Sequence, residues 1–374
     1  MHLLVLAQTP PPAHGQSLMV QTLVDHLPQT APDITLHHIN LSLSRDAADI
    51  GRPRPAKLFA LLGACARALC HRLRHPRTPI TLYYIPAPAK RAALYRDWIA
   101  MLLLRPFFTN LVLHWHASGL GEWLATKATV PERLLTRLLL GRAALSIVLA
   151  PELADDAQHL RPRKTAIVPN GLHAPFTIPE YKLHPAPIRL LYLSACTREK
   201  GLFAALDALA FLNGDTETHA AYYHLTIAGS FADPAEERDF QARLAASPSL
   251  RQTTTYVGPV DEPRKHALLT DADIFVFPTR YAHEAQPLVL IEALAHDLRI
   301  VTTHWRAIPG MLPVLPQIQL AAPAAMPQQL AAAIRAARAA GPANGALRAH
   351  YEAHFTRDAH LAALARALRE AGST

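Results

Sequence analysis

Glu284 and Glu292, separated by seven residues, are the pair whose types and spacing most clearly suggest chemistry in this 374-residue chain. The apolar run Ile274–Phe277 precedes them and predicts a buried strand. Pro287 suits the first position of a helix, where its missing N–H costs nothing. The free N–H groups at such a helix start form an anion site suited to a diphosphate. One turn further, the carboxylate of Glu292 offers two acceptors for the hydroxyls of a ribose.

The segment from residue 271 to 312 resembles the E-x7-E region of the retaining family 4 glycosyltransferases. The resemblance is carried by the strand before Glu284, the run PLVLIEALA at 287–295 and the strand IVTT at 300–303. It implies that Glu284 contacts the donor sugar near the reacting centre and that Glu292 binds the ribose. It also implies a transfer of a sugar with retention at the anomeric carbon.

A second stretch, LLYLSACTREKGL at 190–202, resembles the strand and Lys-Gly turn of the same family. Lys200 would then bind phosphate, since an ammonium on a loop after a strand can neutralise a diphosphate leaving group as its charge develops. Many family members carry an Arg where this chain has Ala195, and Arg198 is the candidate replacement. No metal is implied, because these side chains and the helix start supply the positive charge.

In the N-terminal half, PPPAHGQS at 10–17 resembles the family's glycine-containing loop after the first strand, where Gly15 would let the backbone approach a ligand. His114 and His116 lie on one face of an expected strand end. The family commonly has a His there near the sugar, and we predict that role for His116, which is nearer the loop. A satisfied core histidine is the alternative.

These patterns predict one set of reacting groups and one set of groups that bind the nucleotide-sugar. The expected catalytic residues are Glu284, Lys200 and His116. The expected donor-binding residues are Gly15, Arg198, Gly258, Gln286, Pro287, Leu288 and Glu292, with Gly258 beside the nucleobase. No metal ligand and no cofactor is predicted, because the nucleoside-diphosphate sugar is a substrate. Asp271-Ala-Asp273 has D-x-D spelling, but it precedes an apolar strand and favours a helix-to-strand turn.

The elements that must position these residues alternate along the chain. Apolar runs predict strands at 2–7, 34–39, 80–85, 111–116, 145–149 and 165–168, and again at 189–193, 224–228, 254–257, 274–277 and 300–302. Helical patterns lie between them, at 18–27, 56–75, 92–104, 202–212, 234–246, 263–270 and 288–295. Such alternation predicts an α/β fold with parallel sheets covered on both faces. We therefore expect two Rossmann-like doubly wound domains facing a cleft, as in the GT-B fold of the family.

Four prolines between residues 175 and 187 mark the expected boundary between the domains. The predicted division is an acceptor-binding domain at 1–175, a nucleotide-sugar-binding domain at 176–350, and a C-terminal helix at 351–374 that packs back on the first domain. The length of the chain fits two domains of ordinary size.

The formal charge of +8 is concentrated in one region. Residues 1–176 contain 19 Lys and Arg against 10 Asp and Glu, the remainder 18 against 19, and residues 45–105 alone 12 against 3. No RNP, zinc-finger or basic-zipper pattern is present, so nucleic acid is not an expected partner. A surface that touches anionic lipid is the favoured interpretation, and a solvated basic face without a partner is the alternative.

Cysteine usage and the start of the chain indicate the compartment. The three cysteines form no C-x-x-C pair, which favours a reducing, cytoplasmic setting without disulfides. The first residues lack the basic region of a signal peptide and are interpreted as a strand. No apolar run is long enough to cross a bilayer. Together with the basic stretch, this predicts a cytoplasmic protein at the inner face of the cell membrane.

The resulting hypothesis is a retaining, metal-independent glycosyltransferase. It would move a sugar from a nucleoside diphosphate to a lipid-linked saccharide, in polysaccharide or other glycoconjugate biosynthesis. Two alternatives stay open. One is a nucleotide-sugar 2-epimerase of related fold. The other is a non-catalytic glycosyltransferase-like partner protein, which Ala195 and the Ala285-Gln286 pair favour, since the family prefers Gly-Phe after the first Glu.

Overall fold

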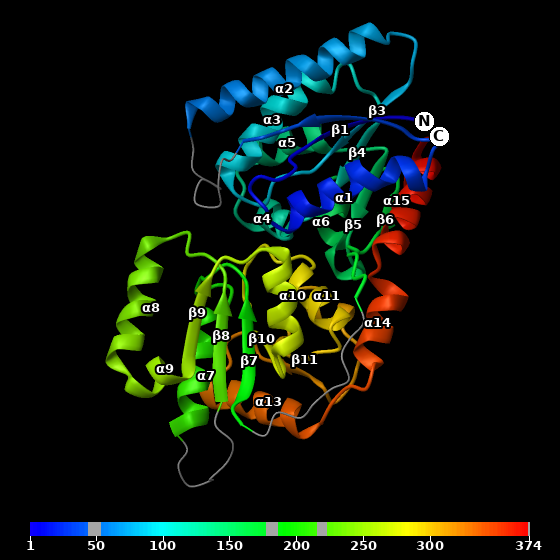
Figure 1. The fold of residues 1–374 in the computed structure, drawn as a ribbon. Coiled ribbons are helices and arrows are strands. Elements are labelled where there is room, and N and C mark those ends of the chain that lie inside the picture. Colours follow the sequence, from blue (N-terminus) through cyan, green and yellow to red (C-terminus); the bar gives the residue numbers. More distant parts are fainter. Residues whose placement is uncertain (44–53, 177–185, 215–222, 373–374) are drawn as a thin grey trace. The chain divides into compact units, whose positions relative to one another are not determined.

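The computed structural model describes residues 1–43, 54–176, 186–214 and 223–372, and the chain in it forms two compact units (Figure 1). Unit 1 consists of Met1–Gly171, His283–Gln286 and Thr356–Thr374. Unit 2 consists of Leu172–Ala282 and Pro287–Phe355.

Unit 1 contains a six-stranded sheet in the order β2-β1-β3-β4-β5-β6, and every neighbouring pair is parallel. Its strands are β1 (His2–Ala7), β2 (Thr35–Asn40), β3 (Ile80–Tyr84), β4 (Leu111–His114), β5 (Leu145–Val148) and β6 (Thr165–Ile167). The order reverses between β1 and β3. In open parallel sheets, ligands bind at the carboxyl ends of the strands beside such a reversal.

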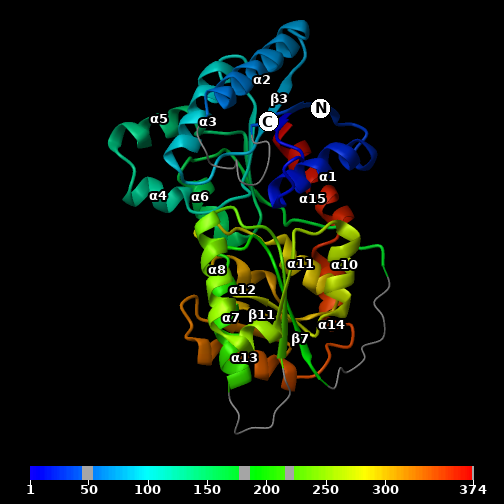
Figure 2. The ribbon, with the colours of Figure 1, turned by 60° about the vertical axis from the view of Figure 1, so that its left-hand side comes forward.

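Alternate side chains of these strands serve opposite faces of the sheet. On one face, Tyr83 joins a core with α1 (Gly15–Thr30) and the C-terminal helix α15 (Arg357–Gly372). On the other, the Tyr84 hydroxyl donates to Asp97 Oδ1 of α3 (Arg91–Leu104) at 2.7 Å. The helices α2 (Pro55–Arg74), α3 and α5 (Val130–Leu140) pack side by side in that second layer (Figure 2). Short helices α4 (Leu120–Thr126), η2 (Pro151–Leu153) and α6 (Ala154–Gln158) complete the unit.

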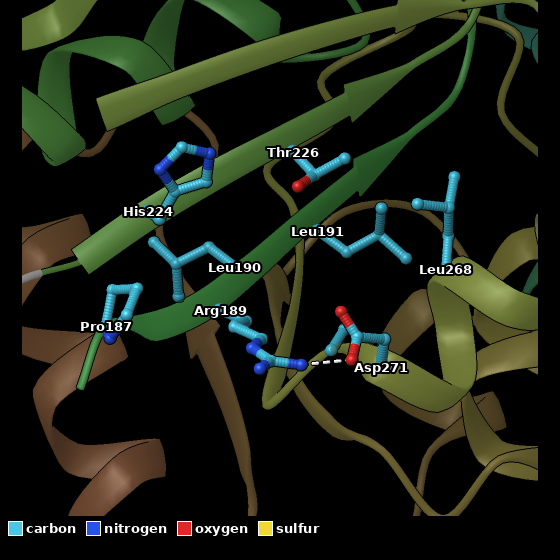
Figure 3. Close-up of a pocket in the computed structure, with 9 residues that line it drawn as sticks. Pro187, Arg189, Leu190, Leu191, His224, Thr226, Leu268 and Asp271 are labelled. Carbon is cyan, nitrogen blue, oxygen red and sulfur yellow. Dashed lines mark hydrogen bonds and ion pairs between the residues drawn. The ribbon is translucent and has the colours of Figure 1, made fainter. Parts of the chain in front are cut away.

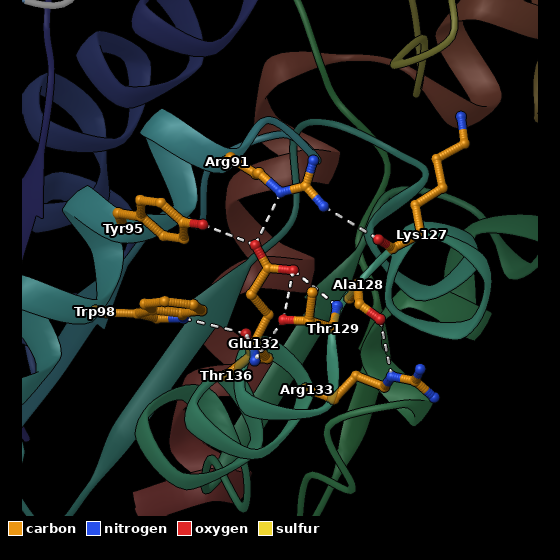
Figure 4. A network of polar contacts seen from close by, with 9 residues as sticks. All are labelled: Arg91, Tyr95, Trp98, Lys127, Ala128, Thr129, Glu132, Arg133 and Thr136. Atoms are coloured by element: carbon orange, nitrogen blue, oxygen red, sulfur yellow. Dashed lines mark hydrogen bonds and ion pairs between the residues drawn. The ribbon is translucent and has the colours of Figure 1, made fainter.

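A polar network fastens α3 to α5 around Glu132 (Figure 4). The Glu132 carboxylate accepts from Arg91 Nε at 2.9 Å, from the Tyr95 hydroxyl at 2.7 Å and from the Thr129 N–H at 2.7 Å. These donors, Arg91 first, lower the pKa of Glu132 to about 2. Since Thr129 and Glu132 also form the capping box of α5, one carboxylate both starts a helix and joins it to its neighbour.

Unit 2 contains a second parallel sheet of six strands in the order β12-β11-β10-β7-β8-β9. Its strands are β7 (Ile188–Leu193), β8 (Tyr223–Ala228), β9 (Thr254–Gly258), β10 (Ile274–Phe277), β11 (Arg299–Thr303) and β12 (Ile318–Ala321). Counted within the unit, this is the 3-2-1-4-5-6 order of dinucleotide-binding folds, read from the other edge. The reversal lies between β7 and β10, so the loops after these two strands should line a ligand site.

Helices cover both faces of the second sheet. The pair α7 (Leu202–Gly214) and α13 (Pro327–Ala339) buries its apolar side chains with those of β7 and β8 in one core. The other helices of unit 2 are α8 (Pro234–Ala246), α9 (Pro248–Thr253), α10 (Glu262–Asp271), α11 (Leu288–Ala295), α12 (Ile308–Met311) and α14 (Ala346–His354).

The predicted fold class, α/β with two Rossmann-like doubly wound domains, is confirmed by the two sheets and their helices. The expected strand at 111–116 was too long, because β4 ends at His114 and leaves His116 in the following loop. Parts of two sequence predictions, the proline-rich bridge at 177–185 and the basic residues at 45–53, lie outside the described residues. The domain boundaries and the cleft stay predictions.

Candidate functional site

Lys200 lies beside the reversal in the sheet of unit 2. Its Nζ stands 4.6 Å from the ring centroid of Tyr281 and 5.7 Å from that of Phe277, at the end of β10. The backbone joins the two loops as well, because the Arg280 N–H donates to the Glu199 carbonyl at 2.8 Å. The predicted phosphate-binding cation is thus held where the topology expects an anionic ligand.

A turn of left-handed backbone makes this position possible. Gly201 has φ +90°, and a Cβ added there would lie 2.3 Å from the Pro278 carbonyl oxygen. Only glycine fits such a close approach at this φ. The Lys-Gly pair therefore has a structural reason, since the glycine lets the loop after β7 rest on the loop after β10.

The helix start predicted after Glu284 is α11, and Pro287 is its N-cap instead of its first residue. The expected first-position role for Pro287 is therefore wrong by one residue, and Leu288 takes that place. The sequence could not distinguish the N-cap from the first helical position, because both accept a residue of φ near −65° without an N–H donor. Glu292 follows one turn into α11, as expected.

Glu292 forms an ion pair that the sequence did not suggest. Lys265 Nζ of α10 lies 2.5 Å from Glu292 Oε1, and the side chains are only 15% and 14% exposed. Burial raises the pKa of the Glu292 carboxyl, and Lys265 opposes this rise. Burial in turn lowers the pKa of Lys265, but Glu292 and Glu262 outweigh it and raise that pKa. No spacing in the sequence relates residues 265 and 292, so only the packing of two helices shows the pair.

Arg198 does not stand free as a substitute for the arginine absent at Ala195. Its guanidinium is ion-paired with Asp239 of α8, and its carbon lies 4.3 Å from the ring centroid of Phe203. The expected role of Arg198 on the diphosphate stays a prediction, and this guanidinium would first have to leave a carboxylate. The sequence could not show the direction of this side chain.

Gly258, expected beside the nucleobase, ends β9 with φ +71° and with open space around its Cβ position. Its carbonyl accepts from the Gly229 N–H at 2.9 Å, which joins the ends of β8 and β9. The backbone here is fixed by the sheet.

Glu284 and His116 lie in the same unit, and their loops are bonded to each other. The Ser118 hydroxyl donates to the Glu284 carbonyl at 2.6 Å, and the Ser118 N–H donates to the His283 carbonyl at 3.3 Å. His283 Nδ1 is hydrogen-bonded to the Ser118 carbonyl at 3.0 Å. Ser118 follows His116 by two residues, so the structure brings together the loops of two predicted catalytic groups. No motif in the sequence had indicated these hydrogen bonds of Ser118.

Gln286, expected to bind the donor, is hydrogen-bonded to two other segments of unit 1. Its Oε1 accepts from the Asn170 N–H at 2.7 Å, and its Nε2 donates to the Leu149 carbonyl at 3.5 Å. Asn170 Nδ2 donates to the Gln286 carbonyl at 3.2 Å. These contacts hold the loop, and donor binding by the Gln286 side chain stays a prediction. The Pro-Asn-Gly turn at 169–171 is the partner of this loop.

Four histidines of unit 1 lie near the end of β4: His14, His114, His116 and His360. The rings of His114 and His116 lie 4.2 Å apart, and those of His114 and His360 6.5 Å apart. Burial, with His360 and His14 adding to it, lowers the pKa of His116 to about 3, and burial lowers that of His360 to about 4. These imidazoles are neutral at pH 7, so His116 can offer a hydrogen bond but no charge.

Gly15, expected to approach a ligand, is the first residue of α1. His14 is the N-cap, and its Nδ1 accepts from the Ser17 N–H at 3.3 Å, while the Ser17 hydroxyl accepts from the His14 N–H at 3.0 Å. His14 thus caps the helix. Gly15 stands at a helix start beside the reversal of the first sheet, where the topology expects ligands.

A cavity of about 300 Å³ in unit 2 is not this site (Figure 3). It is lined by Pro187, Arg189, Leu191 and His224 together with Leu268 and Asp271, and Arg189 is ion-paired with Asp271. These residues lie toward the amino end of β7, away from Lys200. The interpretation of Asp271-Ala-Asp273 as a turn is confirmed, because Asp271 ends α10 and Asp273 accepts from the Arg189 N–H at 2.8 Å. Among the described residues, no group of His, Cys, Asp and Glu could hold a metal ion.

The comparisons with known proteins agree with the observed fold. Residues 187–339, which contain the second sheet, match the family model described as glycosyl transferases group 1. No curated protein sequence matches the chain. Among solved structures, the sucrose-phosphate synthase (tll1590) from Thermosynechococcus elongatus has a TM-score of 0.75 at 18% identity, over 100% of both chains.

Two further structures have the same fold. The lipopolysaccharide outer core galactosyltransferase WaaB in its apo form has a TM-score of 0.67 at 13% identity, over 99% of each chain. Anabaena Alr3699/HepE in complex with UDP has a TM-score of 0.67 at 17% identity, over 99% of this chain and 100% of that one. At these identities the likeness shows the fold.

The fold and the matched domain define the class of this protein. It is an enzyme of the glycosyltransferase type, built from two Rossmann-like domains as in GT-B glycosyltransferases.

Proposed function

We propose that the chain transfers a sugar from a nucleoside diphosphate to a saccharide hydroxyl, with retention at the anomeric carbon, as in family 4 glycosyltransferases. The observation that carries this proposal is the position of Lys200 at the reversal of the matched domain, where the loops after β7 and β10 meet. A diphosphate leaving group needs positive charge at this place as its bond to the sugar breaks.

In this proposal, each predicted site residue contacts one part of the donor. The Lys200 ammonium and the N–H groups at the start of α11 bind the diphosphate. Glu292 accepts from the ribose hydroxyls, and Lys265 lies against the same carboxylate. Gly258 borders the base. Glu284 orients the sugar, and neutral His116 hydrogen-bonds to it. The departing phosphate takes the proton of the acceptor hydroxyl, so no protein group needs to form a covalent bond.

The acceptor proposed is a lipid-linked saccharide of polysaccharide or other glycoconjugate biosynthesis, met by the protein at the inner face of the cell membrane. The excess of basic residues in 45–105 supports contact with anionic lipid. Among the described residues no helix could span a membrane, so the contact proposed is peripheral. UDP-sugars are the first donors to test, because Alr3699/HepE, of the same fold, has been solved with UDP and with UDP-glucose.

The first experiment is a thermal-shift panel with UDP-, GDP- and dTDP-sugars. A ligand at a hundred times its dissociation constant stabilises the folded state by about 2.7 kcal/mol. We expect one nucleotide class to raise the midpoint of the wild type and not that of Glu292→Ala. Glu237→Ala, on the exposed side of α8, is the matched control and should respond like the wild type.

A turnover assay with the donor that binds then separates an enzyme from a non-catalytic relative. Glu284→Gln should keep the donor-induced shift and lose at least about a hundredfold in kcat, in line with the loss of one positioned polar group at a reacting centre. If wild type and Glu284→Gln release nucleoside diphosphate equally fast, Glu284 has no part in the reaction. Mass spectrometry of the donor incubated alone detects an epimer, which would favour the epimerase alternative.

A further inference from the structure

The second helical layer of unit 1 presents apolar side chains to the outside. Large exposed hydrophobic residues number 16 among the described part of the chain, and 12 of them lie between residues 58 and 138. They are Leu58, Phe59, Leu62 and Leu73 of α2, Tyr95, Ile99 and Leu102 of α3, Phe107 just after it, and Val130, Leu134, Leu135 and Leu138 of α5. We call this surface the α2–α3–α5 face. The other four are scattered over the rest of the chain, which is normal for a globular protein.

The apolar residues follow the helical period on the outer side of each helix. On α2, Phe59 and Leu62 stand one turn apart, and Phe59 is 72% exposed. On α5, Leu134 and Leu138 stand one turn apart, and Leu138 is also 72% exposed. The inner sides of the same helices already have their partners, since both helices pack against α3. Among the described residues of unit 1, none covers these outward stripes, which are exposed.

The charge on the α2–α3–α5 face has one sign. The two acidic residues of these helices, Asp97 and Glu132, are buried and bonded within the layer. All other charged side chains on the three helices are basic, and Arg67, Arg74 and Arg137 are exposed. A helical surface that combines large apolar side chains with basic residues alone is typical of segments that lie in the interface of a bilayer.

We infer that the α2–α3–α5 face enters the headgroup region of an anionic membrane, with the stripes of Phe59 and Leu138 among the acyl chains and the arginines on the lipid phosphates. A second copy of the chain suits this surface poorly. A two-fold dimer would bring the same basic patch against itself, and like charges oppose such an interface. The membrane binding inferred here needs no transfer activity. It rests on the proposed function only in that a lipid-linked acceptor would be met at the same surface.

Co-sedimentation of the full chain with vesicles tests the inference. Vesicles of phosphatidylcholine and phosphatidylglycerol in equal amounts should bind the wild type, and vesicles of phosphatidylcholine alone should bind it far more weakly. Each basic residue near an anionic surface contributes about a fivefold factor in partition. We therefore expect Arg74→Gln/Arg137→Gln to lose about 25-fold on the anionic vesicles.

Apolar variants separate insertion from charge attraction. Phe59→Ser/Leu62→Ser and Leu134→Ser/Leu138→Ser should each lower partition by at least about tenfold, since each removes large side chains from the acyl region. Val314→Ser, a fully exposed apolar position in unit 2, is the matched control and should leave partition unchanged. If the apolar variants bind as well as the wild type while the arginine variant does not, the face does not insert and the inference is overturned.

Cys70 of α2 supplies a direct probe of depth. It is exposed, whereas Cys65 and Cys196 are buried. An environment-sensitive fluorophore attached to Cys70 should shift to the blue with anionic vesicles and should not shift with the Phe59→Ser/Leu62→Ser variant.

The competing occupants have their own outcomes. A concentration-dependent dimer in solution that Leu134→Ser/Leu138→Ser abolishes, without vesicle binding by the wild type, would assign the face to a second copy and refute the membrane. If vesicles are not bound, or if the face forms a dimer instead, the donor-induced thermal shift should not change. These outcomes therefore do not test the proposed sugar transfer.

Discussion

Lys265 shows, at the scale of single residues, that a predicted ligand-binding carboxylate has a partner of its own. Glu292 is buried on α11 and ion-paired with Lys265 of α10. The ribose that Glu292 is proposed to bind would therefore meet a carboxylate already held in place. A buried ion pair costs desolvation on both sides, so removing one partner leaves an uncompensated charge.

Replacement of Lys265 by methionine should lower the free energy of unfolding by about 3 kcal/mol, because the carboxylate of Glu292 stays buried without its cation. The double variant Lys265→Met/Glu292→Gln should recover part of this loss. Urea unfolding of the wild type, the two single variants and the double variant measures the coupling. Additive effects would mean that the two residues do not interact in solution.

The histidines near β4 predict a pH dependence of stability. The pKa values of His116 and His360 are about 3 and about 4 in the folded chain, against 6.5 unperturbed. Between pH 4 and pH 6.5 the unfolded chain binds more protons than the folded chain does. The free energy of unfolding is therefore highest above pH 6.5 and decreases as the pH falls toward 4. Each such histidine contributes a slope of at most about 1.4 kcal/mol per pH unit.

The urea midpoint followed from pH 7.5 to pH 4 measures this slope, within the range where histidines titrate. His360→Gln keeps a side-chain donor for the Pro169 carbonyl, which His360 Nδ1 contacts at 2.6 Å, and removes one titrating group. Its profile should be flatter than that of the wild type. If the stability profiles of the wild type and His360→Gln run parallel, the pKa of His360 is not lowered in the folded chain.

At the scale of elements, the loop after β7 depends on one glycine to reach the loop after β10. Gly201→Ala places a Cβ 2.3 Å from the Pro278 carbonyl oxygen at φ +90°. The left-handed backbone alone costs a non-glycine residue about 1–2 kcal/mol, and the displaced carbonyl adds to it, so we expect about 3 kcal/mol in total. Lys200 should move with the loop, and donor affinity should fall.

Gly214→Ala is the control for this prediction. Gly214 ends α7, has no neighbour within 4 Å of its Cβ position, and should tolerate alanine at little cost. Chemical unfolding and the donor-induced thermal shift report the two effects separately. Equal stability of the two alanine variants would mean that the loops do not rest on each other as described.

At the scale of the whole molecule, the last helix belongs to the unit that contains the first strand. Leu361, Leu364 and Leu368 of α15 are buried in one core with Val20 and Leu23 of α1. Unit 1 is thus completed by a segment that follows unit 2 in the sequence.

Leu364→Ala should lower the stability of unit 1 by about 3 kcal/mol through the cavity that it leaves. Arg366→Ala, exposed on the same helix, should change stability by less than about 0.5 kcal/mol. Tryptophan fluorescence reports mainly on this unit, because three of the four tryptophans, Trp98, Trp115 and Trp123, lie in it. An unchanged fluorescence transition in Leu364→Ala would place α15 outside the core in solution.

The strands could be predicted from the sequence because parallel strands are buried on both faces and form continuous apolar runs, such as that of β10. The helix α5 was missed, since its exposed leucines blur the division into an apolar and a polar side. The strand β12 was missed because Gln319 interrupts its short apolar run.

The site could be predicted as far as motifs extend along the chain. The resemblance located Lys200 and Glu292, and the structure places Lys200 at the reversal of the sheet and Glu292 one turn into α11. The partners Lys265, Asn170 and Ser118 could not be predicted, because each meets its partner through tertiary packing across 27 to 166 residues of chain. The direction in which a side chain points could not be predicted from the sequence for the same reason, as Arg198 and Gln286 demonstrate.

The junctions between the units have a consequence for how such a chain can be cut and joined. The Leu172 N–H donates to the Phe355 carbonyl at 2.9 Å, and the next residues on either side, Gly171 and Thr356, are in close contact within unit 1. In terms of gene architecture, residues 172–355 are an insert whose entry and exit are neighbours in space, and the segment His283–Gln286 within it returns to the host unit. A direct join of Gly171 to Thr356 would therefore leave the host chain continuous but would remove His283–Gln286, to which the loops of Ser118 and Asn170 are bonded.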